Sequence, residues 1–134
     1  MKETSNQELI KKAASLVKSK TVKGNLFEDV GCALLAKNNK IYLGVCAAPG
    51  SNTFCAEKAA IGAMLTDGEY KIKKLVAVWK DEKGNLFIIP PCGSCRQLIH
   101  DMDESNLDTE IILDKNKVVK LKELLPYSEW WQKQ

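Results

Sequence analysis

Three cysteines and one glutamate in this sequence stand at spacings that suit metal chemistry. Cys55 lies two residues before Glu57 in "FCAEKAAIG", and two residues separate Cys92 from Cys95 in "PPCGSCRQL". On a helix, Cys92 and Cys95 would share one face and reach a single ion. Cys-x-x-Cys is a common half of a zinc site, and zinc suits such sulfur donors. We therefore expect Cys55, Cys92 and Cys95 to bind Zn²⁺.

The number of expected ligands favours a catalytic ion. Structural zinc is normally closed by four protein ligands, whereas catalytic zinc keeps one position for water. The single histidine, His100, is expected to point away from the cysteines and to be solvated or to cap a helix. Glu57 would be the base that takes a proton from the water. The alternatives are a core Cys55 with a surface Glu57, or a redox pair of Cys92 and Cys95.

The remaining sequence predicts elements that can position these groups. Helical spacing of apolar residues indicates helices over 5–20, 56–65 and 93–102, and the last two begin beside the cysteines. Free N–H groups at a helix start favour the thiolate that binds metal. Helices that alternate with pairs of strands indicate an α/β domain with a mixed sheet. The predicted strands cover 30–36, 41–48, 72–80, 86–90, 109–114 and 117–121.

Length and composition are those of one globular domain over residues 1–134. The hydrophobic share is 45%, the charged share 28% and the net charge only +3, with basic residues scattered along the chain. Nucleic-acid binding is therefore not indicated. No apolar run is long enough to span a membrane, and the N-terminus is too polar for a signal peptide, so we expect a cytoplasmic location. The five cysteines are expected to be thiols or metal ligands.

The sequence resembles the cytidine deaminase superfamily, specifically its small homotetrameric nucleoside branch. The resemblance covers nearly the whole chain and rests on "VGCALL", "GV", "CAEKAAI", "PCGSCRQ" and "KELLP". It implies a three-layer α/β/α sandwich with a central mixed sheet of about five strands. It also implies a zinc-dependent aminohydrolase, in which water activated by zinc attacks an amino-bearing ring carbon of a cytidine-like nucleoside and ammonia leaves.

The resemblance assigns roles to individual residues. Cys55, Cys92 and Cys95 would bind zinc, Glu57 would move protons, and the backbone N–H of Ala56 would hold the carbonyl of the base.

Charge compensation is the next implied role. Three thiolates on Zn²⁺ leave a net negative charge, which family members offset with an arginine directly after the glutamate. Here Lys58 stands at that place, and we expect Arg96 to help from the other helix. A solvated Lys58 is the alternative.

The substrate pocket departs from the family pattern. Cytidine deaminases read ribose with an Asn-x-Glu pair, where this chain has Cys46 and Ala48, and Glu28 replaces an aromatic residue before "VG". We take Cys46, Ala48 and Glu28 as candidate substrate contacts; strand packing of Cys46 and a solvated Glu28 are the alternatives. The short loop before Cys55 resembles that of blasticidin S deaminases. Blasticidin S, or another modified nucleoside or base, is therefore an alternative substrate.

Two adjacent tryptophans, Trp130 and Trp131, lie close to the C-terminal end of the sequence and are costly to leave in water. In the family the C-terminal segment reaches a neighbouring subunit's active site, so we expect a homotetramer in which Trp130 lines a neighbour's pocket. Packing against its own sheet is the alternative. A zinc-stabilised nucleoside-binding protein without turnover is the non-enzymatic alternative. Glu57 argues against it, because a purely structural zinc site does not need that carboxylate.

Overall fold

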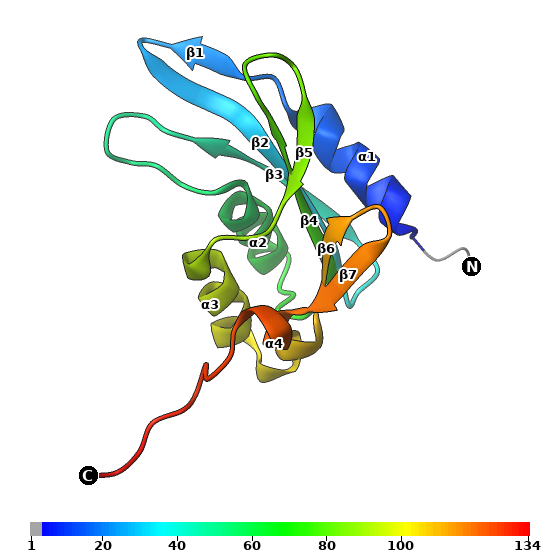
Figure 1. Ribbon diagram of the computed structural model, residues 1–134, viewed down its shortest axis with the longest axis vertical. Helices are drawn as coiled ribbons and strands as arrows, with labels where there is room; N and C mark the ends of the chain where they lie inside the picture. The colour runs from blue at the N-terminus through cyan, green and yellow to red at the C-terminus, as the bar shows by residue number, and fades with distance from the viewer. Residues whose placement is uncertain (1–3) are drawn as a thin grey trace.

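The computed structural model describes residues 4–134 and has three layers, with a mixed β-sheet between helices (Figure 1). α1 (Asn6–Leu16) packs on one face of the sheet. α2 (Ala56–Thr66) packs on the other face, together with α3 (Gly93–Met102). The α/β/α sandwich expected from the sequence is confirmed. No helix in the described part of the chain is both long and apolar enough to cross a membrane.

Five strands lie side by side across the sheet. β2 (Asn25–Ala36) and β4 (Ile72–Lys80) form its centre and pair antiparallel. β3 (Ile41–Ala47) flanks β2, and β6 (Glu110–Asp114) runs parallel to β4. β7 (Lys117–Lys120) completes the sheet antiparallel to β6.

Two further strands bring the sheet to seven, where the sequence suggested about five. β5 (Leu86–Ile89) pairs with the last residues of β4. It lies on the same edge of β4 as β6, which pairs with the earlier residues of that strand. β1 (Lys20–Val22) forms a hairpin with the first residues of β2. Its turn is Lys23–Gly24, both with positive φ, as tight hairpin turns require. All three β1 residues are exposed, so the strand needs no alternation of apolar and polar residues and could not be predicted from one.

Residues 31–36 of the central strand β2 are buried on both faces, which explains the uninterrupted apolar sequence of that part of the strand. Cys32 and Leu34 point to the side of α2 and α3, whereas Ala33 and Leu35 point to α1. The strand therefore supports the helices that carry the candidate site.

Two short elements brace the far end of α3. η1 (Glu104–Asp108) follows that helix, and α4 (Leu121–Leu124) follows β7. The buried Asn106 donates to the carbonyl oxygen of Ile99 in α3 at 2.9 Å and accepts from the N–H of Ile72 in β4 at 2.9 Å. These bonds fix α3 relative to the sheet.

Gly44 in β3 sets how closely α2 can approach the sheet. A Cβ at Gly44 would overlap backbone atoms of Ala56 and Ala60. We expect Gly44→Ala to lower the free energy of unfolding by about 1–3 kcal/mol, because the helix that begins beside Cys55 must shift. Thermal unfolding measures this. The control is Gly62→Ala, where a Cβ meets nothing within 4 Å; equal destabilisation by both changes would contradict the prediction.

Candidate metal centre and active site

The three expected zinc ligands meet where α2 and α3 begin. Cys55 is the N-cap residue of α2, Cys92 is that of α3, and Cys95 lies in the first turn of α3. Cys55 makes no side-chain capping bond to α2, so its Sγ atom is available to an ion. All three Sγ atoms lie within 4.8 Å of one another. The thiols that the sequence singled out are therefore brought together.

The sulfur geometry fits zinc. Cys55 Sγ and Cys92 Sγ are 3.7 Å apart, and all three cysteines are free thiols. Two sulfurs of a tetrahedral zinc site, each about 2.3 Å from the ion, lie about 3.8 Å apart, whereas a disulfide would join them at about 2 Å. No histidine or carboxylate in residues 4–134 joins this cluster as a fourth ligand. Cys55, Cys92 and Cys95 can thus hold zinc with one position open to water.

The protonation of the thiols also calls for a cation. Burial raises the pKa of Cys55 and Cys95, and the negative charge of Glu57 raises that of Cys95 further. Burial acts in the same direction on Cys92, but hydrogen bonds, first from the backbone N–H of Cys95, outweigh it and lower its pKa. Three thiolates in contact are therefore favourable only beside a compensating positive charge, which a divalent ion provides.

Glu57 is buried beside these thiols. It is 4% exposed, and none of the ion pairs found within residues 4–134 includes it. Burial raises its pKa, and its charge in turn raises the pKa values of Cys32 and Cys95, which places the carboxylate next to the cluster. A buried carboxyl with a raised pKa is suited to accept and return a proton.

Ala56 begins α2 and is almost fully buried. The N–H groups of the first helical turn have no acceptor within the helix. The N–H of Ala56 can therefore donate to a ligand beside Glu57.

The two cations expected near the thiolates make other contacts. Lys58 Nζ donates to Ser94 Oγ at 2.9 Å, which links α2 to α3. Arg96 donates through Nε to the carbonyl oxygen of Pro91 at 2.7 Å and through Nη1 to that of Leu124 at 3.1 Å. Lys58 thus connects α2 with α3, whereas Arg96 ties α3 to the residue before Cys92 and to the end of α4.

A β-bulge in β2 sends two adjacent acidic side chains to different neighbours. The pairing of β2 with β3 is interrupted there, and Glu28 has a φ of 61°. Glu28 lies 3.7 Å from Lys20 Nζ, in a cavity between α1 and β3. Asp29 Oδ1 instead accepts a hydrogen bond from Cys46 Sγ at 2.8 Å. The prediction that Glu28 contacts substrate stays a prediction; the bulge that separates Glu28 from Asp29 is not visible in the residue pattern.

The residues after β3 bring Cys46 close to a zinc ligand. Ala47 pairs with Phe54 in an isolated antiparallel bridge. In that register the residue before Ala47 lies across from the residue after Phe54, so Cys46 faces Cys55 across the bridge. Ala48 follows in the loop and is half-buried.

Two expectations about individual side chains differ from the structure. His100 is not solvated: it is 5% exposed, with Nδ1 3.2 Å from Asp101 and Nε2 3.1 Å from Glu129. The alternative that a tryptophan packs against its own sheet is wrong, since Trp130 is 64% and Trp131 is 77% exposed. The C-terminal aromatic residues are therefore open to contact with another molecule.

Comparison with known proteins agrees with this site. Residues 3–107 match the family described as the cytidine and deoxycytidylate deaminase zinc-binding region. The chain is 35% identical over 114 residues to a blasticidin-S deaminase from Bacillus cereus, covering 75% of this chain and 79% of that protein. It is 38% identical over 71 residues to a cytidine deaminase from Mycoplasma genitalium, covering 51% of each.

Similarity of fold extends over almost the whole chain. The crystal structure of cytidine deaminase from Mycobacterium tuberculosis matches with a TM-score of 0.76 at 24% identity, covering 96% of this chain and 100% of that one. The family match spans well over half of the sequence and contains every candidate zinc ligand. The chain therefore belongs to the cytidine and deoxycytidylate deaminase family of zinc-dependent aminohydrolases.

Proposed function

We propose that residues 1–134 act as a single deaminase domain that hydrolyses a cytidine-like aminopyrimidine nucleoside or a close analogue and releases ammonia. The observation that carries this proposal is a buried Glu57, without an ion-pair partner in the described chain, beside three converging thiols. Zinc held by Cys55, Cys92 and Cys95 would supply an activated water molecule as the nucleophile.

The protein's own groups would then guide the proton and the base. Glu57 takes the proton of the attacking water and returns it to the amino group, which leaves as ammonia while the ring carbon keeps the oxygen. The N–H of Ala56 donates to the ring carbonyl and fixes the orientation of the base. Lys58 and Arg96, near the starts of α2 and α3, offset the negative charge of the thiolates.

Blasticidin S or another modified nucleoside or base is the second candidate substrate. Cys46 and Ala48 offer neither amide nor carboxylate where the resembled cytidine deaminases read ribose. The likeness to a blasticidin-S deaminase, which covers three quarters of the chain, supports the same alternative.

We further propose a homotetramer in which Trp130 reaches a neighbouring subunit's active site. Trp130 and Tyr127 form an edge-on pair with ring centroids 5.8 Å apart, and both are exposed. Large exposed aromatic surface favours association. We expect light scattering to give the mass of four chains and Trp130→Ala to raise KM. A monomer at working concentration would contradict the proposal.

A deamination panel tests the proposed function. Zinc-loaded protein is assayed by absorbance and ammonia release with cytidine, deoxycytidine, cytosine, blasticidin S, isocytosine and amino-purines, with Glu57→Ala as the control. Turnover of cytidine would support the first candidate and require a new route to the ribose. Turnover confined to blasticidin S or another modified compound would support the second. Zinc-bound protein that is silent across the panel would overturn both.

A further inference from the structure

The hydrogen bond between Cys46 and Asp29 holds the Asp29 carboxylate in one position. Cys46 Sγ donates to Asp29 Oδ1 at 2.8 Å and accepts from the backbone N–H of Val30 at 3.3 Å. Burial, followed by the hydrogen bond with Asp29, raises the pKa of Cys46 to about 11, so the thiol keeps its proton and remains a donor at neutral pH. No hydrogen bond or ion pair found in residues 4–134 uses Asp29 Oδ2. One carboxylate oxygen is held and the other is available.

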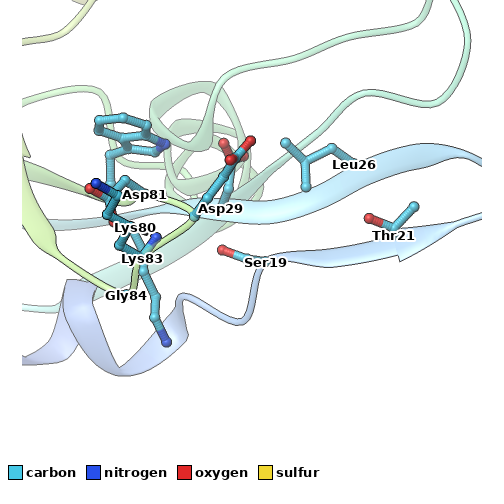
Figure 2. A pocket seen from close by; sticks show the side chains of 10 residues that line it. Ser19, Thr21, Leu26, Asp29, Lys80, Asp81, Lys83 and Gly84 are labelled. Carbon is cyan, nitrogen blue, oxygen red and sulfur yellow. Dashed lines mark hydrogen bonds between the residues drawn. The ribbon is translucent and has the colours of Figure 1, made fainter.

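Asp29 is joined to the end of β3 through Cys46 and also lines a cavity. Its partner Cys46 lies across the bridge from Cys55. On another side Asp29 lines a cavity of about 690 Å³, a size typical of ligand pockets. Figure 2 shows Asp29 between Thr21 and Leu26 on one side and the turn that joins β4 to β5 on the other. A ligand bound at the thiols would have to extend along Cys46 to reach Asp29.

The chemistry of this position defines what it would recognise. A carboxylate only accepts hydrogen bonds, so the ligand must offer a donor, either a neutral hydroxyl or a cationic N–H group. Trp79, which also lines the cavity, is 37% exposed and stacks on Phe87 with centroids 5.5 Å apart. Its ring can cover the apolar part of such a group or the face of a cation.

We propose that Asp29, held by Cys46, determines substrate specificity by accepting a hydrogen bond from a donor group that lies beyond the deaminated ring. This inference rests on the proposed function, because it concerns the same site. Glu28, the neighbouring residue in the sequence, is another acid that could accept such a hydrogen bond, but the bulge places it against Lys20 and in a different cavity. The bulge thereby directs Asp29, and not Glu28, toward Cys46.

The test compares variants at Asp29 with the best substrate of the panel. We expect Asp29→Ala to raise KM about tenfold while kcat changes by less than about threefold and zinc content stays the same. Asp29→Asn keeps the oxygen that accepts from Cys46 and puts an NH2 donor in place of the free oxygen. A hydroxyl can accept from this donor and a cationic N–H group cannot, so the variant should retain part of the affinity for a hydroxyl but none of it for a cation. Cys46→Ala should raise KM less than Asp29→Ala does. Cys46→Ser keeps a hydrogen-bond donor, so its KM should equal that of the original protein. Asp108→Asn, at an exposed carboxylate in η1, is the matched control.

Direct binding separates this inference from the proposed function. Calorimetry measures cytidine and blasticidin S on Glu57→Gln protein, with and without Asp29→Ala. Turnover with an unchanged KM in Asp29→Ala, or a raised KM only in Glu28→Gln, would overturn the inference and leave the deaminase function standing. If binding depended on Asp29 but the original protein turned over no compound of the panel, the inference would stand and the deaminase function would be overturned. Absence of binding by either compound, together with a silent panel, would overturn both.

Discussion

Glu57→Ala is expected to lower kcat by a factor of about 10²–10⁴ while zinc stays bound. The carboxylate lies beside the thiols but outside the set of ligand atoms that converge on an ion. Its loss removes the group that moves the proton and leaves the metal ligands intact. Ammonia release gives kcat, and elemental analysis gives the zinc content per chain.

Glu57→Gln separates the charge from the shape of the side chain. Glutamine fills the same buried space but cannot take a proton, so we expect kcat to fall as in Glu57→Ala. The folded state should be at least as stable as that of the original protein, because a buried carboxyl without an ion-pair partner is replaced by a neutral amide. Glu104→Gln, at an exposed glutamate of η1, should leave both quantities unchanged. A Glu57 variant that keeps most of its kcat, or that loses zinc, would contradict the assigned role.

The metal centre was predictable because its signals are local. Cys55 and Cys92 each stand directly before a helix, and the starts of those helices can be read from the apolar spacing that follows. Cys95 and Glu57 then follow from helical geometry alone. The inner parts of β2 and β4, residues 31–36 and 75–78, were predictable for a similar reason, since burial on both faces demands apolar runs, whereas residues 25–29 of β2 were not predicted.

The features that sequence reasoning missed depend on contacts between distant segments. The bulge that directs Asp29 to Cys46 has a positive φ at Glu28, a conformation that a glutamate in the sequence does not predict. His100 is buried because Glu129, far along the chain, lies against it. In both cases the decisive partner is set by tertiary packing and not by spacing in the sequence.

Cys95→Ala is expected to abolish zinc binding, and with it turnover. Cys95 is fully buried, and its sulfur lies within 4.8 Å of the other two. Tight zinc binding stabilises the folded chain by about 4 kcal/mol when free zinc exceeds Kd a thousandfold. Since each kcal/mol shifts the thermal midpoint by roughly 3–5 °C in a domain of this size, we expect the midpoint to fall by about 10–20 °C. Elemental analysis and thermal unfolding measure the two effects.

Cys32→Ala is the matched control, because it deletes the same thiol at another fully buried position outside the cluster. It should keep zinc and lose only about 1 kcal/mol through the small cavity that remains. A strong chelator should lower the midpoint of the original protein and of Cys32→Ala alike, but it should not affect Cys95→Ala, which has no zinc to give up. If the chelator destabilised Cys95→Ala as much as the original protein, the ion would be bound elsewhere. The three thiols at the starts of α2 and α3 would then not be its ligands.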